Sequence, residues 1–139
     1  MRIIKCLVFV FLCFSVCGCG NILYHAKTGD IKSLDKALES GFSIETKNQL
    51  GSTPLIIAAY SGQTETVEYL CKKGANLNAQ NEKGVTALIS AAYYNFYDIA
   101  EVLVNYGADK TLQDMYGNTA FDYASQYEYT RMIKLLGEQ

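Results

Sequence analysis

The sequence predicts an all-α fold in which about four similar helix-turn-helix units stack into a solenoid. The first observation is an internal repeat of 33 residues, visible in the aligned segments Gly51-Ser52-Thr53-Pro54-Leu55, Gly84-Val85-Thr86-Ala87-Leu88 and Gly117-Asn118-Thr119-Ala120-Phe121. The second is that two further sets keep the same period, namely Gly41, Gly74 and Gly107, and Asn48, Asn81 and Asp114. A fixed period of this kind is typical of proteins whose units bury their apolar faces against one another.

The first two units differ in how fully they keep the pattern. Unit one, about residues 20–47, retains only Ala26, Gly29, Leu34, Leu38 and Gly41. In unit two, residues 48–80, Thr53 is a suitable N-cap and Pro54 suits the first position of a helix. The apolar run after Pro54 ends near Gly62. A second helix is predicted from about Thr64 to Lys73, before Gly74, with an apolar face of Val67, Leu70 and Cys71.

The last two units follow the same plan. Unit three, residues 81–113, has its second apolar face at Ala100, Leu103 and Val104 and closes at Gly107. Unit four, residues 114–139, has Ile133, Leu136 and Gly137 in the corresponding places. Helices this short are marginal in water when isolated, so stacking of the units must order them.

The residues of units two and three resemble the ankyrin repeat. In unit two the resemblance is carried by Thr53-Pro54-Leu55, Ala58-Ala59, Gly62, Val67, Leu70 and Lys73-Gly74-Ala75-Asn76. In unit three it is carried by Thr86, Leu88, Ala91-Ala92, Leu103 and Gly107-Ala108-Asp109. The resemblance implies an ankyrin-repeat solenoid with β-turn connections and a concave binding face. One departure is that the histidine usual after the signature leucine is replaced by Ile56, Ile89 and Asp122.

The N-terminal segment predicts export. Arg2 and Lys5 precede an apolar run from Cys6 to Val16, which is the layout of a secretory signal peptide over residues 1–18. The run is short for a membrane span, although an uncleaved anchor is the less favoured alternative. Val16-Cys17-Gly18-Cys19 looks like the lipobox of bacterial lipoproteins, in which the last cysteine carries the lipid.

We therefore expect lipidation at Cys19 and a membrane-anchored lipoprotein of the cell envelope. Cys17 departs from the lipobox pattern, where Ala or Ser is usual, and ordinary cleavage after Gly20 would instead give a secreted or periplasmic soluble protein. The domain that follows, residues 19–139, is the expected ankyrin-repeat domain. The sequence leaves open which membrane would hold the anchor.

Composition argues against catalysis and against nucleic-acid binding. The net charge is −2, whereas nucleic-acid binding needs clustered cations. His25 is the only histidine, and the glycines do not form a phosphate-binding loop. We expect His25 and Cys71 to be structural residues. The sequence thus predicts no enzyme, no cofactor, no metal and no small-molecule substrate.

Tyrosines supply the candidate binding face, with 11 in the chain and no tryptophan. Tyrosine is enriched at protein interfaces because it combines contact area with a hydroxyl group. In ankyrin-like arrays the partner is usually held by the turn tips and by the ends of the first helices. The predicted partner-binding residues at those places are Gln49, Leu50, Tyr60, Glu82, Lys83, Tyr93, Tyr94, Met115, Tyr116 and Tyr127. The alternative is that the tyrosine rings only fill gaps between adjacent units.

The leading functional hypothesis is a non-enzymatic protein–protein interaction module that holds a protein partner on a concave, tyrosine-rich face. The alternative is an inhibitor or immunity factor that blocks or protects a specific envelope enzyme or toxin. The sequence does not distinguish between them, because a repeat specifies the platform and leaves the ligand to the variable positions.

Overall fold

The structure is a computed structural model that describes residues 21–137. Three of its helices are preceded by a threonine N-cap, namely Thr53, Thr86 and Thr119. Each threonine hydroxyl accepts a hydrogen bond from the backbone N–H three residues later, which satisfies one of the free donors at a helix start. The signal peptide and Cys19 predicted above lie outside the described residues.

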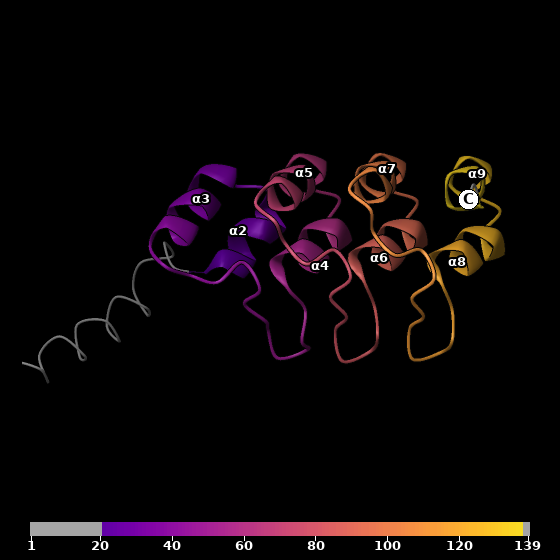
Figure 1. Ribbon diagram of the computed structural model, residues 1–139, viewed down its shortest axis with the longest axis horizontal. Coiled ribbons are helices and arrows are strands. Elements are labelled where there is room, and N and C mark those ends of the chain that lie inside the picture. Colours follow the sequence, from indigo (N-terminus) through magenta and orange to yellow (C-terminus); the bar gives the residue numbers. More distant parts are fainter. Residues whose placement is uncertain (1–20, 138–139) are drawn as a thin grey trace, which may run out of the picture.

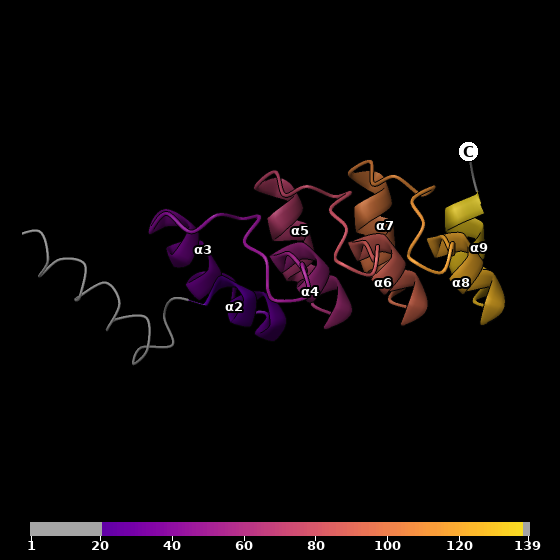
Figure 2. The same ribbon diagram turned by 90° about the horizontal axis from the view of Figure 1, so that it is seen from below.

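Eight helices form four pairs within these residues. They are α2 (Ile22–Thr28), α3 (Ile31–Glu39), α4 (Pro54–Tyr60), α5 (Thr64–Lys72), α6 (Ala87–Tyr93), α7 (Tyr97–Asn105), α8 (Ala120–Gln126) and α9 (Thr130–Gly137). The first helices α2, α4, α6 and α8 lie in one row and the second helices in another, as Figure 1 shows. Figure 2, turned by 90°, shows the same order of pairs along the molecule. The predicted all-α solenoid of four helix-turn-helix units is confirmed.

Small and branched apolar side chains hold the rows together. Paired alanines, Ala58-Ala59 in α4 and Ala91-Ala92 in α6, are fully buried where the first helices pack on each other. Leu70 and Leu103 are fully buried in the second row, where α5 packs on α7. Alanine permits close approach of helices and leucine fills the wider space between the rows, so each unit completes the core of its neighbour.

Three long connections project from the helices on one side of the molecule (Figure 1). Each turns at the periodic polar residue predicted from the repeat, namely Asn48, Asn81 or Asp114. Asn48 Oδ1 accepts backbone N–H groups from Leu50 and Ser52 at 2.9 Å each. Asn81 and Asp114 do the same in their own turns. The 33-residue period at these positions therefore arises because the same hydrogen-bonded turn occurs in all three connections.

Adjacent turns are joined by backbone hydrogen bonds. The N–H of Glu82 donates to the carbonyl of Leu50 at 3.0 Å, and the N–H of Met115 donates to that of Lys83 at 2.9 Å. Gly84, at φ +72°, lies so close to the next turn that an added Cβ would stand 2.9 Å from the Cα of Asp114. Only glycine fits that backbone angle and that space together.

Candidate functional site

Four exposed tyrosines form a continuous series of ring contacts across three units. The series, here called the tyrosine ladder, consists of Tyr60, Tyr94, Tyr93 and Tyr127 in spatial order. Successive ring centroids lie 5.0, 4.9 and 5.6 Å apart, and each pair of rings meets edge to face at 73–87°. Tyr60 and Tyr93 are the last residues of α4 and α6, whereas Tyr94 and Tyr127 directly follow α6 and α8. The predicted alignment of Tyr60, Tyr93 and Tyr127 is thus observed, with Tyr94 as the link.

The ladder contains the same contact twice. Tyr60 meets Tyr94, and Tyr93 meets Tyr127, in each case across 34 residues of sequence. Because the repeat is 33 residues long, the residue that follows a first helix lies beside the last residue of the first helix before it. The Tyr93–Tyr94 pair then joins the two contacts into one series.

Three further aromatic rings pack against the rings of the ladder. Phe96 stacks on Tyr94 at 5.9 Å and 24°, and Tyr129 stacks on Tyr127 at 5.7 Å and 29°. Phe96 also rests on Gly62, where an added Cβ would stand 3.2 Å from the ring. Tyr123 packs edge to face on Tyr93 at 5.3 Å. These three supporting rings were missed from sequence, although Phe96 and Tyr129 share the 33-residue period.

Tyr123 is itself fixed by the turn of its unit. Its hydroxyl donates to Asp114 Oδ2 at 2.5 Å, and the same carboxylate holds the turn through the N–H groups of Tyr116 and Asn118. Burial, together with this hydrogen bond, raises the pKa of Tyr123. The hydrogen bond therefore connects the last turn to the supporting layer of the ladder.

The proximity of the ladder tyrosines raises the pKa of two of them. A hydrogen bond with the Tyr60 hydroxyl, with burial as the second cause, raises the pKa of Tyr94 to about 12. A hydrogen bond with Tyr93 raises the pKa of Tyr127 in the same way. Both phenols stay neutral at physiological pH, because a phenol ionises only near its pKa.

The other six predicted residues lie at the tips of the three turns. Leu50, Met115 and Tyr116 are 57%, 63% and 72% exposed, which is unusual for large apolar side chains. The remaining three, Gln49, Glu82 and Lys83, are also exposed. The backbone bonds between adjacent tips hold these side chains in one line.

The structure thus brings the ten predicted residues together as two groups. The tips precede the first helices in the chain, and the ladder lies at the far ends of those helices. A first helix of seven residues is about 10 Å long at 1.5 Å per residue. A partner that contacts both groups must therefore span at least the length of a first helix.

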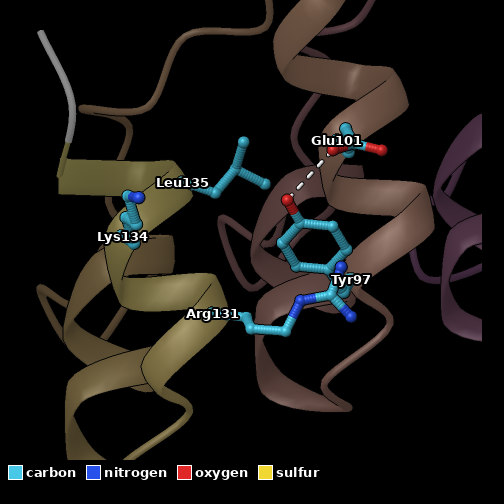
Figure 3. A pocket seen from close by; sticks show the side chains of 5 residues that line it. All are labelled: Tyr97, Glu101, Arg131, Lys134 and Leu135. Atoms are coloured by element: carbon cyan, nitrogen blue, oxygen red, sulfur yellow. Dashed lines mark hydrogen bonds between the residues drawn. The ribbon is translucent and has the colours of Figure 1, made fainter.

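An open cleft of about 450 Å³ lies between α7 and α9, away from the predicted residues (Figure 3). The Arg131 guanidinium lies 3.9 Å from the centroid of the Tyr97 ring, and the Tyr97 hydroxyl donates to Glu101 Oε1 at 3.0 Å. That hydrogen bond is the main reason that the pKa of Tyr97 is raised. The contact of Arg131 with the Tyr97 ring connects units three and four.

The remaining candidate groups are buried. Cys71 is a free thiol whose burial raises its pKa to about 11, which makes it a weak nucleophile. His25 is buried without a hydrogen bond to either ring nitrogen, and its Nδ1 lies 3.9 Å from Asp30. From residue 21 to residue 137, no three His, Cys, Asp or Glu side chains group as a metal site.

None of the helices in that same range has the length and apolar character needed to cross a membrane.

The chain matches a known protein family. A family model described as ankyrin repeats, in three copies, matches residues 22–114. The match begins at α2 and ends at the turn residue Asp114, so it covers the three units that precede α8. A comparison with curated protein sequences finds no match.

Proposed function

The chain belongs to the ankyrin-repeat family, and we propose its function from that membership. Ankyrin repeats are protein–protein interaction modules. The proposed function is to hold a protein partner, without catalysis, on the tyrosine ladder and the turn tips. The partner would bury the exposed rings and the apolar tip residues, and the charged tip residues Glu82 and Lys83 would select among partners.

The exposure of the ladder is the observation that carries this proposal. Its four rings remain 39–58% exposed although each contacts at least one other ring. Rings that only filled gaps between units would be less exposed, as the partly buried Phe96 and Tyr129 are. A contiguous aromatic surface in water favours association, which makes a binding role a better explanation than packing alone.

The rigidity of the array supports the same proposal. The rings are held by edge-to-face contacts with one another and by stacking on Phe96 and Tyr129. Binding to a surface that is already ordered loses little conformational entropy. Tyrosine also has few torsions to freeze, so it suits a preformed binding surface.

The test is a double substitution in the ladder. Tyr60→Ala with Tyr93→Ala should lower capture of the partner from the native envelope by about tenfold or more, as expected when central aromatic contacts are removed. The matched control is Tyr106→Ala, since Tyr106 is 42% exposed but directly follows α7 and lies outside the ladder. Thermal unfolding of each variant checks that the fold is retained. Equal capture by a folded double variant would refute the proposal. Capture of an enzyme or toxin would identify the alternative role as an inhibitor or immunity factor.

We also propose that the domain is exported and tethered through Cys19. The support is the basic start, the apolar run and the lipobox-like segment of residues 1–19. Because Asn21 already caps α2, only Gly20 separates Cys19 from the fold, and a lipid there would hold the domain against the bilayer. Mass spectrometry of the mature N-terminus distinguishes a lipidated Cys19 from a free Asn21.

A further inference from the structure

We propose that the tyrosine ladder binds an uncharged, proline-rich segment in the polyproline II conformation. This inference rests on the proposed function and names the chemical class of the partner. It is carried by three properties of the ladder, which are the spacing of its rings, the angles between them and its lack of charge.

The spacing of the ladder matches the repeat of a polyproline II helix. Tyr60 and Tyr93 occupy equivalent positions in adjacent units, and two ring-to-ring steps of 5.0 and 4.9 Å separate them. Equivalent rings therefore lie no more than about 10 Å apart, in keeping with the 8–10 Å between packed helices. A polyproline II helix has three residues per turn at about 3.1 Å each, so the same face recurs about every 9 Å. Two residues three positions apart in such a segment would therefore meet the equivalent rings of Tyr60 and Tyr93.

The ring angles suit the shape of proline. Neighbouring ladder rings meet at 73–87°, so each pair offers two apolar surfaces at nearly a right angle to each other. Proline is a compact apolar ring that can contact both surfaces at once, and aromatic surfaces bind proline-rich segments in this way. The segment is already extended before binding, so ordering it costs little entropy.

The polar atoms of the ladder complement a segment without internal hydrogen bonds. Each ladder tyrosine carries a hydroxyl group that can donate one hydrogen bond, and the four side chains are 39–58% exposed, so donors are available to a bound segment. The carbonyl groups of a polyproline II helix are unpaired and can accept these donors. No ladder ring is charged, and its chain neighbours Ser61, Asn95 and Gln126 are neutral, with Glu128 the exception.

The alternatives fit this surface less well. An amphipathic helix needs an apolar groove along the ladder, whereas the ladder is a single series of rings. An acidic or basic peptide finds no opposite charge on the rings. A glycan strand stacks on flat ring faces, whereas neighbouring ladder rings are set edge to face.

The experiment is a peptide titration of the full chain, followed by isothermal calorimetry. The probe is a blocked, uncharged peptide of about nine residues, long enough to pass the whole ladder, with proline at every third position. The matched peptide has glycine at those positions. We expect saturable binding of the proline peptide and a loss of at least about tenfold for the glycine peptide.

Substitutions in the ladder test whether the peptide binds there. Tyr94→Ala should reduce affinity for the proline peptide at least about tenfold, and Tyr106→Ala should leave it unchanged. If Tyr94→Ala fails to fold, Tyr60→Ala serves instead, because Tyr60 is 58% exposed and ends the series. Equal affinity for the two peptides, no saturable binding at millimolar concentration, or binding of a glycan oligomer in their place would overturn the inference.

The outcome also separates this inference from the proposed function. If the proline peptide fails to bind but the Tyr60→Ala/Tyr93→Ala variant still loses its protein partner, the ladder binds a partner of another class and only the polyproline inference is wrong. If capture of the protein partner does not depend on the ladder, the proposed function itself is wrong.

Discussion

Tyr94 is the residue that joins the two halves of the candidate surface. Its ring contacts Tyr60 of the preceding unit and Tyr93 beside it in the chain, and it stacks on Phe96. Every path along the ladder from α4 to α8 passes through Tyr94 and Tyr93, so removal of the Tyr94 ring should affect the surface more than removal of either end ring.

The raised pKa of Tyr94 predicts a loss of stability at alkaline pH. In the unfolded chain a phenol titrates near 10, whereas Tyr94 in the folded protein titrates near 12. The folded state therefore holds the proton more tightly. This contribution to stability is fully present below pH 10 and is lost as the pH rises from about 10 to about 12.

Urea unfolding across that pH range measures the effect. In Tyr94→Phe, which keeps the ring, the free energy of unfolding should fall less steeply with pH than in the unsubstituted protein. Tyr106→Phe is the control and should follow the unsubstituted protein. Identical slopes for all three proteins would contradict the raised pKa of Tyr94 in the folded protein.

At the scale of elements, α8 differs from α4 and α6 in how it begins. All three start after a threonine, but only in α8 does the residue three positions later, Asp122, return the hydrogen bond. The Asp122 carboxylate accepts the backbone N–H of Thr119 at 2.8 Å and its hydroxyl at 2.7 Å, which completes a capping box. The hydrogen bonds from Thr119 lower the pKa of Asp122. In this last unit Asp122 stands where the family usually has histidine, and it makes a polar contact of its own with the start of the helix.

Loss of this cap should destabilise the protein measurably. We expect Thr119→Ala to lower the free energy of unfolding by about 1 kcal/mol, because one N–H at the start of α8 loses its acceptor. Ser125→Ala is the control, since Ser125 is exposed on the same helix and alanine favours helix formation. Urea denaturation gives both values. A loss in Thr119→Ala no larger than in Ser125→Ala would mean that the cap contributes nothing.

At the scale of the whole molecule, stability depends on the fit between neighbouring units. Leu70 of α5 and Leu103 of α7 are fully buried at equivalent positions, and Leu136 of α9 continues the series. The network of Tyr69, Asp35 and Lys73 adds a polar link between units one and two: the Tyr69 hydroxyl donates to Asp35, and Lys73 lies 3.1 Å from the same carboxylate. These groups are exposed enough for water to screen the ion pair, so the apolar core supplies most of the stability.

A core substitution should therefore affect the whole array. We expect Leu70→Ala to lower the free energy of unfolding by about 2–5 kcal/mol, through lost apolar contact and the cavity that remains. The control is Leu50→Ala, because Leu50 is 57% exposed at a turn tip and should change stability little. Chemical denaturation of both variants measures the difference. Similar losses in both would contradict the observed burial.

Much of the fold followed from the sequence because local chemistry repeats at a fixed period. The threonine caps and the buried apolar faces of α5 and α7 were predicted from residue type and spacing, and the predicted second helix of unit two differs from α5 by one residue at its end. The export signal and lipidation at Cys19 remain predictions, since they concern residues that the structure does not describe.

The sequence by itself determined the stacked units, their helices and the residue types of the candidate surface, because caps, apolar spacing and turn residues act within a few positions. Only the tertiary structure decided how the tyrosines meet. The contacts Tyr60–Tyr94 and Tyr93–Tyr127 join residues 34 positions apart, and they arise from the offset with which one unit packs on the next. That offset also places Phe96 and Tyr129 beneath the ladder. Ring contacts across units depend on packing geometry that no local sequence pattern specifies.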